Sequence, residues 1–215
     1  MNTASRRGFL AAGAAVMASA AGCLGVLSNS YNPTAKPDEI GMTRPTQGPD
    51  DAPVRVIAFE NFGCGHCATF NESVLPVLLD KHVRPGTVQY LHADFMLSRS
   101  AENYPAGNAA RAVYETAGND AFWPFGRAMY QYRSGSLSLQ TIEDIAEAAG
   151  GVGTAARTAA KNGGYAEALS ADTELGAEWG VDRTPTVFVE EEYVNPFDNG
   201  DPDPDALVEA VEAKL

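Results

Sequence analysis

Apolar and polar positions alternate in a recognisable pattern from residue 54 onward. Val54–Phe59 is a nearly continuous apolar run, typical of a strand that is buried on both faces, and Gly63 then turns the chain. The next apolar residues recur three and four positions apart, as on one face of an α-helix; they are Phe70, Val74, Val77 and Leu78. After a turn at residues 84–86, we interpret residues 87–92 as a second strand. Strand, helix and strand in this order predict two parallel strands joined by a right-handed crossover, and so an α/β fold.

The middle of the chain is helical by the same criterion. Glycines fall where helices are expected to stop, and Ser138 stands where an N-cap is expected. We expect helices at residues 105–116, 121–132, 139–149 and 165–179, with a shorter one near 154–161. We interpret this region, at about residues 98–180, as a helical insertion in the topology of the sheet.

The last part of the chain returns to strand patterns. Residues 186–189 form an apolar run, and a short partner strand is expected around residues 193–194. Asp203 and Pro204 then mark the start of a closing amphipathic helix, because Asp is a good N-cap and Pro suits the first helical position. The sheet therefore continues after the helical insertion.

The first 23 residues have the pattern of an export signal. Arg6 and Arg7 precede an Ala-rich apolar stretch at residues 8–22, which is shorter than the roughly 20 residues of a membrane-spanning helix. The segment around the arginine pair resembles a twin-arginine signal, and the residues before Cys23 resemble a lipobox. We expect export, cleavage before Cys23 and lipid attachment to Cys23; the alternative is an uncleaved N-terminal anchor.

Residues 24–52 carry several prolines and polar residues and show no sustained apolar period. Such a composition is typical of a flexible linker. We expect a tether between a lipid anchor and one folded domain at residues 53–215.

The net charge of the chain limits the kinds of partner that it can attract. The chain has 15 basic and 28 acidic residues, a net charge of -13, so we expect no nucleic-acid partner and no attraction to anionic lipid headgroups. A solvated acidic surface is the simple interpretation. Adaptation to high salt is the other, suggested by the few lysines and the abundant alanine and glycine.

Only three cysteines occur, and Cys64 and Cys67 are the two in the expected domain. A disulfide across so short a loop stabilises little, which favours reactivity over a structural role. Cys64 would lie at the start of a helix, where backbone N–H groups stabilise a thiolate, and Cys67 one turn later would resolve a mixed disulfide. His66 would lower the thiol pKa further and make the disulfide more oxidising.

A metal site is the main alternative for a Cys-x-x-Cys pair. Zinc needs about four ligands, and the expected domain offers no further cysteine. We interpret His82 and His92 as surface or helix-end histidines. The sequence has no glycine loop typical of nucleotide binding, and we expect neither a cofactor nor a resident metal.

Three segments carry a family resemblance. FENFGCGHC, NAARAVYETAGNDAFWPFGRAMYQY and ELGAEWGVDRTPTVFVEEEYV resemble the DsbA-like branch of the thioredoxin superfamily, over about residues 53–215. The resemblance implies a thioredoxin fold, a central mixed sheet flanked by helices, with an inserted helical subdomain. It also implies that Pro185 is a cis-proline beside the cysteine pair, and that the backbone of Thr184 pairs with a substrate polypeptide. Without the resemblance, a trans bond before Pro185 would be expected.

Two departures from the family pattern concern the cysteine pair. Many relatives have a buried acid six residues before the first cysteine, where this chain has Ala58. Glu60 would lie on the same strand face and is our candidate for proton transfer, or else a solvated carboxylate at the end of the strand. The dipeptide Gly65-His66 resembles that of protein disulfide isomerases, so the redox potential does not follow from the resemblance.

These observations together predict a thiol-disulfide oxidoreductase that acts on cysteines of exported proteins. The oxidase direction is preferred, with a reductase or isomerase as alternatives that use the same site. We expect the protein on the outer face of the cell membrane, recycled by an unidentified membrane or soluble redox partner. A non-enzymatic metal chaperone or binding module is the competing class.

Overall fold

A five-stranded mixed sheet forms the centre of the computed structural model, which describes residues 43–96, 103–132 and 137–215. The strand order is β1-β3-β2-β4-β5, and the strands are β1 (Thr46–Gln47), β2 (Val54–Glu60), β3 (Val88–Asp94), β4 (Thr186–Val189) and β5 (Glu192–Val194). β2 and β3 are parallel, in a register that pairs Val54 with Val88, whereas the other neighbouring pairs are antiparallel. The predicted parallel pair is therefore confirmed.

The helix after β2 runs from Gly65 to Val83 and is not a regular α-helix. Its segments are α1 (Gly65–Thr69), η2 (Phe70–Val74), α2 (Leu75–Leu78) and η3 (Leu79–Val83), of which η2 and η3 have wider π turns. Pro76 has no N–H, and its ring excludes a normal bond to the preceding turn, so a wider turn accommodates it. The helix is thus distorted around Pro76, and its apolar face is buried against the sheet.

All the predicted helices of the middle region are present, with ends shifted by a few residues. They are α3 (Asn103–Ala117), α4 (Asn119–Tyr130), α5 (Leu139–Gly150), α6 (Gly153–Asn162) and α7 (Ala166–Glu178). The Ser138 hydroxyl accepts a hydrogen bond from the Thr141 N–H at 3.0 Å, and Asp203 caps α8 (Pro204–Glu212) through the Ala206 N–H. Both N-caps follow the prediction.

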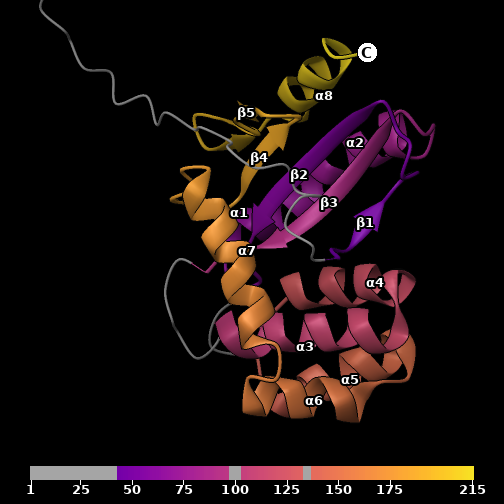
Figure 1. Ribbon diagram of the computed structural model, residues 1–215, viewed down its shortest axis with the longest axis vertical. Coiled ribbons are helices and arrows are strands. Elements are labelled where there is room, and N and C mark those ends of the chain that lie inside the picture. Colours follow the sequence, from indigo (N-terminus) through magenta and orange to yellow (C-terminus); the bar gives the residue numbers. More distant parts are fainter. Residues whose placement is uncertain (1–42, 97–102, 133–136) are drawn as a thin grey trace, which may run out of the picture.

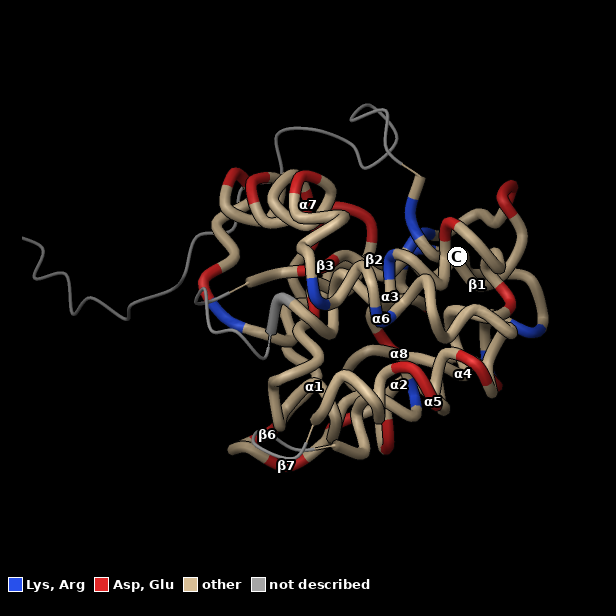
Figure 2. Tube along the Cα trace, turned by 90° about the horizontal axis from the view of Figure 1, so that it is seen from below, with Lys and Arg blue, Asp and Glu red and all other residues tan. Residues whose placement is uncertain are grey.

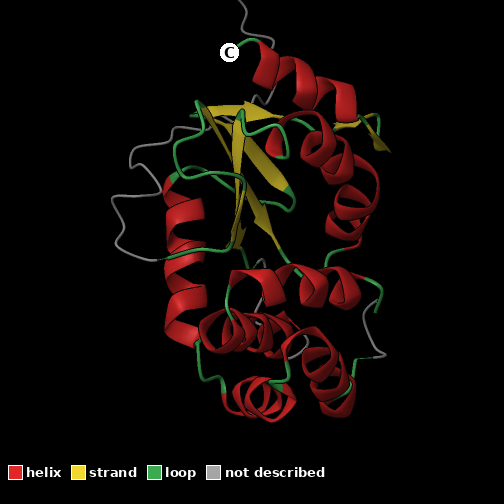
Figure 3. Ribbon diagram, turned by 90° about the vertical axis from the view of Figure 1, so that its right-hand side faces the viewer, coloured by secondary structure: helices red, strands yellow, loops and turns green. Residues whose placement is uncertain are grey.

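Helices cover the two faces of the sheet, and α3 to α6 form a bundle at one end (Figure 1, Figure 3). The helix of residues 65–83 and α8 pack on one face, through a core that includes Phe70, Leu78 and Leu207. The C-terminal half of α7 packs on the other face, where Trp179 contacts Phe59 and Phe188 edge to face. α7 thus extends beyond the bundle and covers this face of the central sheet.

Residues 43–52 belong to the folded domain, and the tether predicted at residues 24–52 is wrong for this part. Thr46 pairs with Leu91 of β3, and the Arg44 guanidinium forms a buried ion pair with Asp172 of α7 at 2.8 Å. The Trp123 indole also donates to the Thr46 carbonyl at 3.1 Å. So short a strand is held by backbone and polar side-chain contacts, and it therefore needs no apolar period. Residues 24–42 and Cys23 lie outside the described residues.

Acidic residues are spread over many elements of the surface, including α5, α7 and β7 (Asp201–Pro202) (Figure 2). This agrees with the expected acidic surface of the domain. Within the ranges that the structure describes, no helix is both long and apolar enough to cross a membrane.

Candidate active site

Cys64 and Cys67 lie at the start of α1, directly after β2. Cys64 is the N-cap residue, has an extended backbone and is half-buried, whereas Cys67 is one turn further on and completely buried. The predicted spacing of one helical turn is confirmed, and it separates an accessible thiol from a buried one.

The Cys64 thiol is surrounded by groups that favour its thiolate. The hydrogen bond from the Cys67 thiol has the largest effect, and the Thr184 side chain and the backbone N–H groups of Cys67 and His66 add to it. They outweigh the effect of burial and lower the pKa of Cys64 to about 5. Cys64 therefore carries a thiolate at neutral pH.

Cys67 has the opposite environment. Burial raises the pKa of its thiol well above the usual range, and both the hydrogen bond to Cys64 and the negative charge of Glu60 act in the same direction. The reduced pair consequently consists of a thiolate at Cys64 and a thiol at Cys67. Only the half-buried sulfur is ready to react with a disulfide.

A second segment, 120 residues away in sequence, faces the pair. The peptide bond between Thr184 and Pro185 is cis, as the resemblance implies, and the Cys64 Sγ lies 3.2 Å from the Thr184 carbonyl oxygen, to which the thiol form donates. β4 begins at the next residue, Thr186, so the sheet holds this segment opposite α1.

His66 is exposed on the same surface. Its ring packs edge to face against Phe197, with ring centroids 5.8 Å apart, in the hairpin of β6 (Phe197–Asp198) and β7. This hairpin was not expected from the sequence. His66 thus lies on the rim of the cysteine site rather than inside it.

Glu60 is buried, and the interpretation of a solvated carboxylate is wrong. Its side chain accepts hydrogen bonds from the Tyr90 hydroxyl at 2.7 Å, the Tyr130 hydroxyl at 2.9 Å and the His92 Nδ1 at 3.3 Å. The Asn71 amide also donates to Glu60, and it donates to the Cys67 carbonyl at 3.0 Å. These donors replace water around the carboxylate and connect it to the cysteine helix.

His92 is also buried, only 3% exposed, so its interpretation as a surface or helix-end histidine is wrong. Burial opposes the imidazolium, but Asp94 and Glu60 on either side raise the pKa of His92 to about 10. His82, in contrast, does lie at the end of its helix. Among the described residues, no group of three or more His, Cys, Asp or Glu is arranged to hold a metal ion.

The residues around Glu60 come from three elements, and sequence reasoning missed them. Tyr90 and His92 lie on β3, Asn71 on η2 and Tyr130 on α4. The sequence predicted two parallel strands but not their register, which pairs Ala58 with His92 and Glu60 with Asp94. This register brings the polar residues of β3 beside Glu60.

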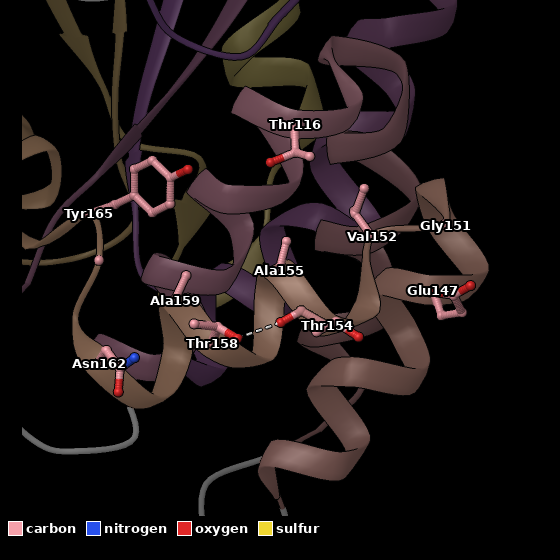
Figure 4. Close-up of a pocket in the computed structure, with 11 residues that line it drawn as sticks. Thr116, Glu147, Gly151, Val152, Thr154, Ala155, Thr158, Ala159, Asn162 and Tyr165 are labelled. Carbon is pink, nitrogen blue, oxygen red and sulfur yellow. Dashed lines mark hydrogen bonds between the residues drawn. The ribbon is translucent and has the colours of Figure 1, made fainter.

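A separate open hollow of about 860 Å³ lies on the bundle, between α3, α5 and α6 (Figure 4). It is lined largely by small and hydroxyl side chains, and the Thr158 hydroxyl donates to the Thr154 carbonyl at 2.8 Å. None of the residues of the cysteine site lines it. We therefore assign the candidate active site to the cysteine pair.

Curated relatives of the chain carry names from disulfide chemistry. A probable disulfide bond formation protein D of Bacillus cereus is 32% identical over 103 residues, which is 48% of this chain and 47% of that protein. The disulfide bond formation protein D of Bacillus subtilis is 23% identical over 179 residues, 80% of this chain and 77% of that protein. The chain thus matches about half the length of the first of these relatives.

Solved structures show the same fold. Oxidised BdbD from Bacillus subtilis superposes with a TM-score of 0.72 at 21% identity and covers 80% of this chain and 92% of that chain. Chlamydia trachomatis DsbA gives a TM-score of 0.70 at 20% identity, covering 83% and 95% respectively. A family model described as thioredoxin matches residues 41–213. The chain therefore belongs to the thioredoxin family and has the DsbA-like form of its fold.

Proposed function

We propose that this protein is a thiol-disulfide oxidoreductase in which Cys64 is the nucleophile and Cys67 the resolving cysteine. The observation that carries the proposal is the geometry of the pair: Cys64 is half-buried at the N-terminus of α1 beside Thr184, and Cys67 is buried one turn later. The thiol pKa is accordingly lowered for Cys64, to about 5, and raised for Cys67. A structural cysteine pair needs no such difference, whereas disulfide exchange needs one reactive and one protected thiol. The names of the curated relatives support the same chemistry.

The oxidation of a substrate dithiol proceeds in two exchanges. A substrate thiolate attacks the Cys64 sulfur of the disulfide, and the Cys64–Cys67 bond breaks. The Cys67 sulfur leaves with the electron pair and takes up a proton. A second substrate thiolate then attacks the substrate sulfur of the mixed disulfide, and Cys64 leaves as a thiolate. The substrate gains a disulfide and the protein gains two electrons.

The oxidase direction is the one that the charge distribution favours. Stabilising the Cys64 thiolate stabilises the reduced protein, which makes the disulfide a stronger oxidant. The low pKa of Cys64 also makes it a good leaving group in the second exchange. A reductase or isomerase would use the same residues and is distinguished by the reduction potential.

Thr184 and Pro185 are proposed to present the substrate. The cis bond lies next to Cys64 and directly before β4, where an extended polypeptide would pair with the backbone. His66, exposed on the rim, would contact the same polypeptide and tune the thiolate.

Glu60 is proposed to act on the proton of Cys67. Its charge raises the pKa of this thiol, and Asn71 links the carboxylate to the Cys67 backbone. Glu60 would thus act on the proton of the Cys67 thiol, which Ala58 cannot do because it has no polar side chain.

The proposed substrates are cysteine-containing exported proteins, and a separate redox partner would reoxidise the cysteine pair. Export by the twin-arginine signal and lipid attachment at Cys23 would place the domain on the outer face of the membrane. Residues 24–42 would then form the tether. Labelling cells with a fatty-acid analogue and comparing wild type with Cys23→Ala tests this part, since only the wild type should carry the label.

Oxidative refolding of reduced ribonuclease tests the chemistry. The wild-type protein should restore ribonuclease activity, whereas Cys64→Ser should not, and equilibration with glutathione gives the reduction potential. A potential near that of cytosolic thioredoxins would contradict the oxidase direction and favour a reductase. Full activity of Cys64→Ser would remove Cys64 from the mechanism, and stoichiometric metal binding without turnover would favour the chaperone alternative.

A further inference from the structure

A narrow cavity of about 50 Å³ lies beside the buried Glu60 cluster, between β3, α4 and the helix of residues 65–83. Three of the four side chains that donate to Glu60 line it, namely Asn71, His92 and Tyr130. The exposed residues Pro76 and Arg127 line it as well. The cavity therefore extends from the buried cluster toward the surface.

Two buried polar atoms indicate what the cavity contains. The Gln47 Nε2 has no hydrogen-bond partner among the described residues, and the His92 Nε2 has only the Asp94 carboxylate at 3.6 Å, beyond hydrogen-bond distance; both side chains line the cavity. Buried polar groups are rarely left without a partner, and a water molecule needs only about 10–15 Å³ of such volume. The volume, the unpartnered Gln47 Nε2 and the His92 Nε2 without a hydrogen bond together favour a few ordered water molecules.

The chemistry of Cys67 requires a route for protons. The sulfur gains a proton when the disulfide opens and loses it when the disulfide closes, yet Cys67 has no exposed surface. The four hydrogen bonds to Glu60 occupy roughly all of the lone-pair positions of its carboxylate. A proton can therefore reach Glu60 from solvent only through one of these donors.

Tyr130 is the donor suited to this exchange. A hydroxyl group both donates and accepts, so it can pass a proton to Glu60 while taking another from water, without changing its own charge. Tyr90 donates to Glu60 in the same way but does not line the cavity. The nitrogen atoms of Asn71 and His92 that face Glu60 are donors only, in the amide and in the imidazolium.

We propose that the cavity holds water and that the Tyr130 hydroxyl passes protons between this water and Glu60, which exchanges them with Cys67. This inference rests on the proposed function. When the disulfide opens, the Tyr130 hydroxyl passes its proton to the Glu60 carboxylate and takes another from water, and Glu60 passes a proton to the departing Cys67 sulfur. When the disulfide closes, the same steps run in reverse as the Cys67 sulfur attacks Cys64 and the outgoing thiolate leaves.

Tyr130→Phe and Tyr90→Phe are a matched pair of variants, because each removes one hydroxyl that donates to Glu60. Reduced protein is mixed rapidly with oxidised glutathione, quenched and analysed by mass spectrometry. The first step forms the Cys64–glutathione mixed disulfide, and the second closes the Cys64–Cys67 bond. We expect Tyr130→Phe to slow closure of the disulfide by about tenfold or more, because a positioned proton-transfer group contributes at least this much to a rate. Tyr90→Phe should slow closure by less than about threefold, because Tyr90 does not line the cavity.

Filling the cavity provides an independent test. A Cβ added at Gly126 would lie 3.5 Å from Phe62 Cε1, an ordinary contact, so Gly126→Ala and Gly126→Val should fold while taking up the space of the water. Closure should slow progressively from wild type to Ala to Val. Ala155→Val adds bulk in the separate hollow of α6 and should leave closure unchanged.

The possible outcomes distinguish a failure of the proposed function from a failure of the proton route alone. Absence of a mixed disulfide at Cys64 would overturn the proposed function itself. Normal formation of the mixed disulfide, with equal closure rates in Tyr130→Phe and Tyr90→Phe, would overturn only the proton route. An unchanged rate in Gly126→Val, or a dry cavity in a high-resolution crystal structure, would also overturn the proton route.

Discussion

The exposed and the buried ends of the active site are built in different ways. At the exposed end, Cys64 takes its reactivity from groups within three residues of it and from the facing Thr184. At the buried end, Glu60 is surrounded by donors 11 to 70 residues away in sequence. The groups at the exposed end lower the pKa of Cys64, and burial together with the charge of Glu60 at the buried end raises the pKa of Cys67.

The comparison predicts that removing Cys64 affects activity far more than stability. Cys64→Ser should lower the rate of substrate oxidation by at least about 10³-fold, because the nucleophile is lost. Its free energy of unfolding, measured on the reduced protein in urea below pH 5, where Cys64 is a neutral thiol, should change by less than about 1 kcal/mol. Retained oxidation in this variant would mean that the exposed thiol is not the reactive one.

Removing the carboxylate at the buried end should have the opposite effect. Glu60→Ala leaves the Tyr90, Tyr130 and Asn71 donors without their acceptor and should lower the free energy of unfolding by about 3–5 kcal/mol. Glu143→Ala is the control, since it breaks a partly exposed ion pair with Arg157 and should cost less than about 1 kcal/mol. Equal losses in the two variants would show that the Glu60 cluster is not held by its buried hydrogen bonds.

The pH dependence of the exposed thiol is the third test. Alkylation of Cys64 by iodoacetamide should rise with pH and reach half its maximum near pH 5, because the thiolate is the reactive form. At pH 7 the thiolate should exceed the thiol by about 100-fold. Since the folded pKa lies below the unfolded value, Cys64 stabilises the reduced protein above pH 9, and this contribution is lost as the pH falls through 5.

Cys67→Ala provides the control for this titration. It removes the hydrogen bond that has the largest effect on the pKa of Cys64, so the midpoint should move to higher pH. A midpoint that stays near pH 5 would instead assign the effect to the backbone and to Thr184.

The smallest effect is expected for a single donor of the buried cluster. Tyr90→Phe removes one hydrogen bond to Glu60 and should lower the free energy of unfolding by about 1–1.5 kcal/mol in a urea titration. A loss as large as that of Glu60→Ala would show that the cluster is cooperative.

Features with local physical causes were predictable from the sequence. Ser138 and Asp203 cap their helices because a side-chain oxygen reaches an N–H group three residues away. The cysteine spacing places Cys64 at the start of a helix and Cys67 one turn later. The cis bond before Pro185 was predictable only through the resemblance, because an isolated X-Pro bond favours the trans form.

Features that depend on distant partners were not predictable. From the sequence, Arg44 was interpreted as part of a polar linker. In the structure it forms a buried ion pair with Asp172. Glu60 resembled a solvated carboxylate and His92 a surface histidine, since a single sequence gives the polarity of a side chain but not the groups that will surround it. Burial of a charged group is favourable only when partners replace its water, and those partners come together only on folding.

The sequence by itself determined which atoms are available for chemistry: two thiols one helical turn apart, a proline to face them and an acid on the preceding strand. The tertiary structure decided how protons and charge are distributed among these atoms. Its parallel β2–β3 register and the packing of α4 bring Tyr90, His92 and Tyr130 to Glu60. The physical reason is that pKa values depend on burial and on charges within a few ångströms, and folding alone sets these distances.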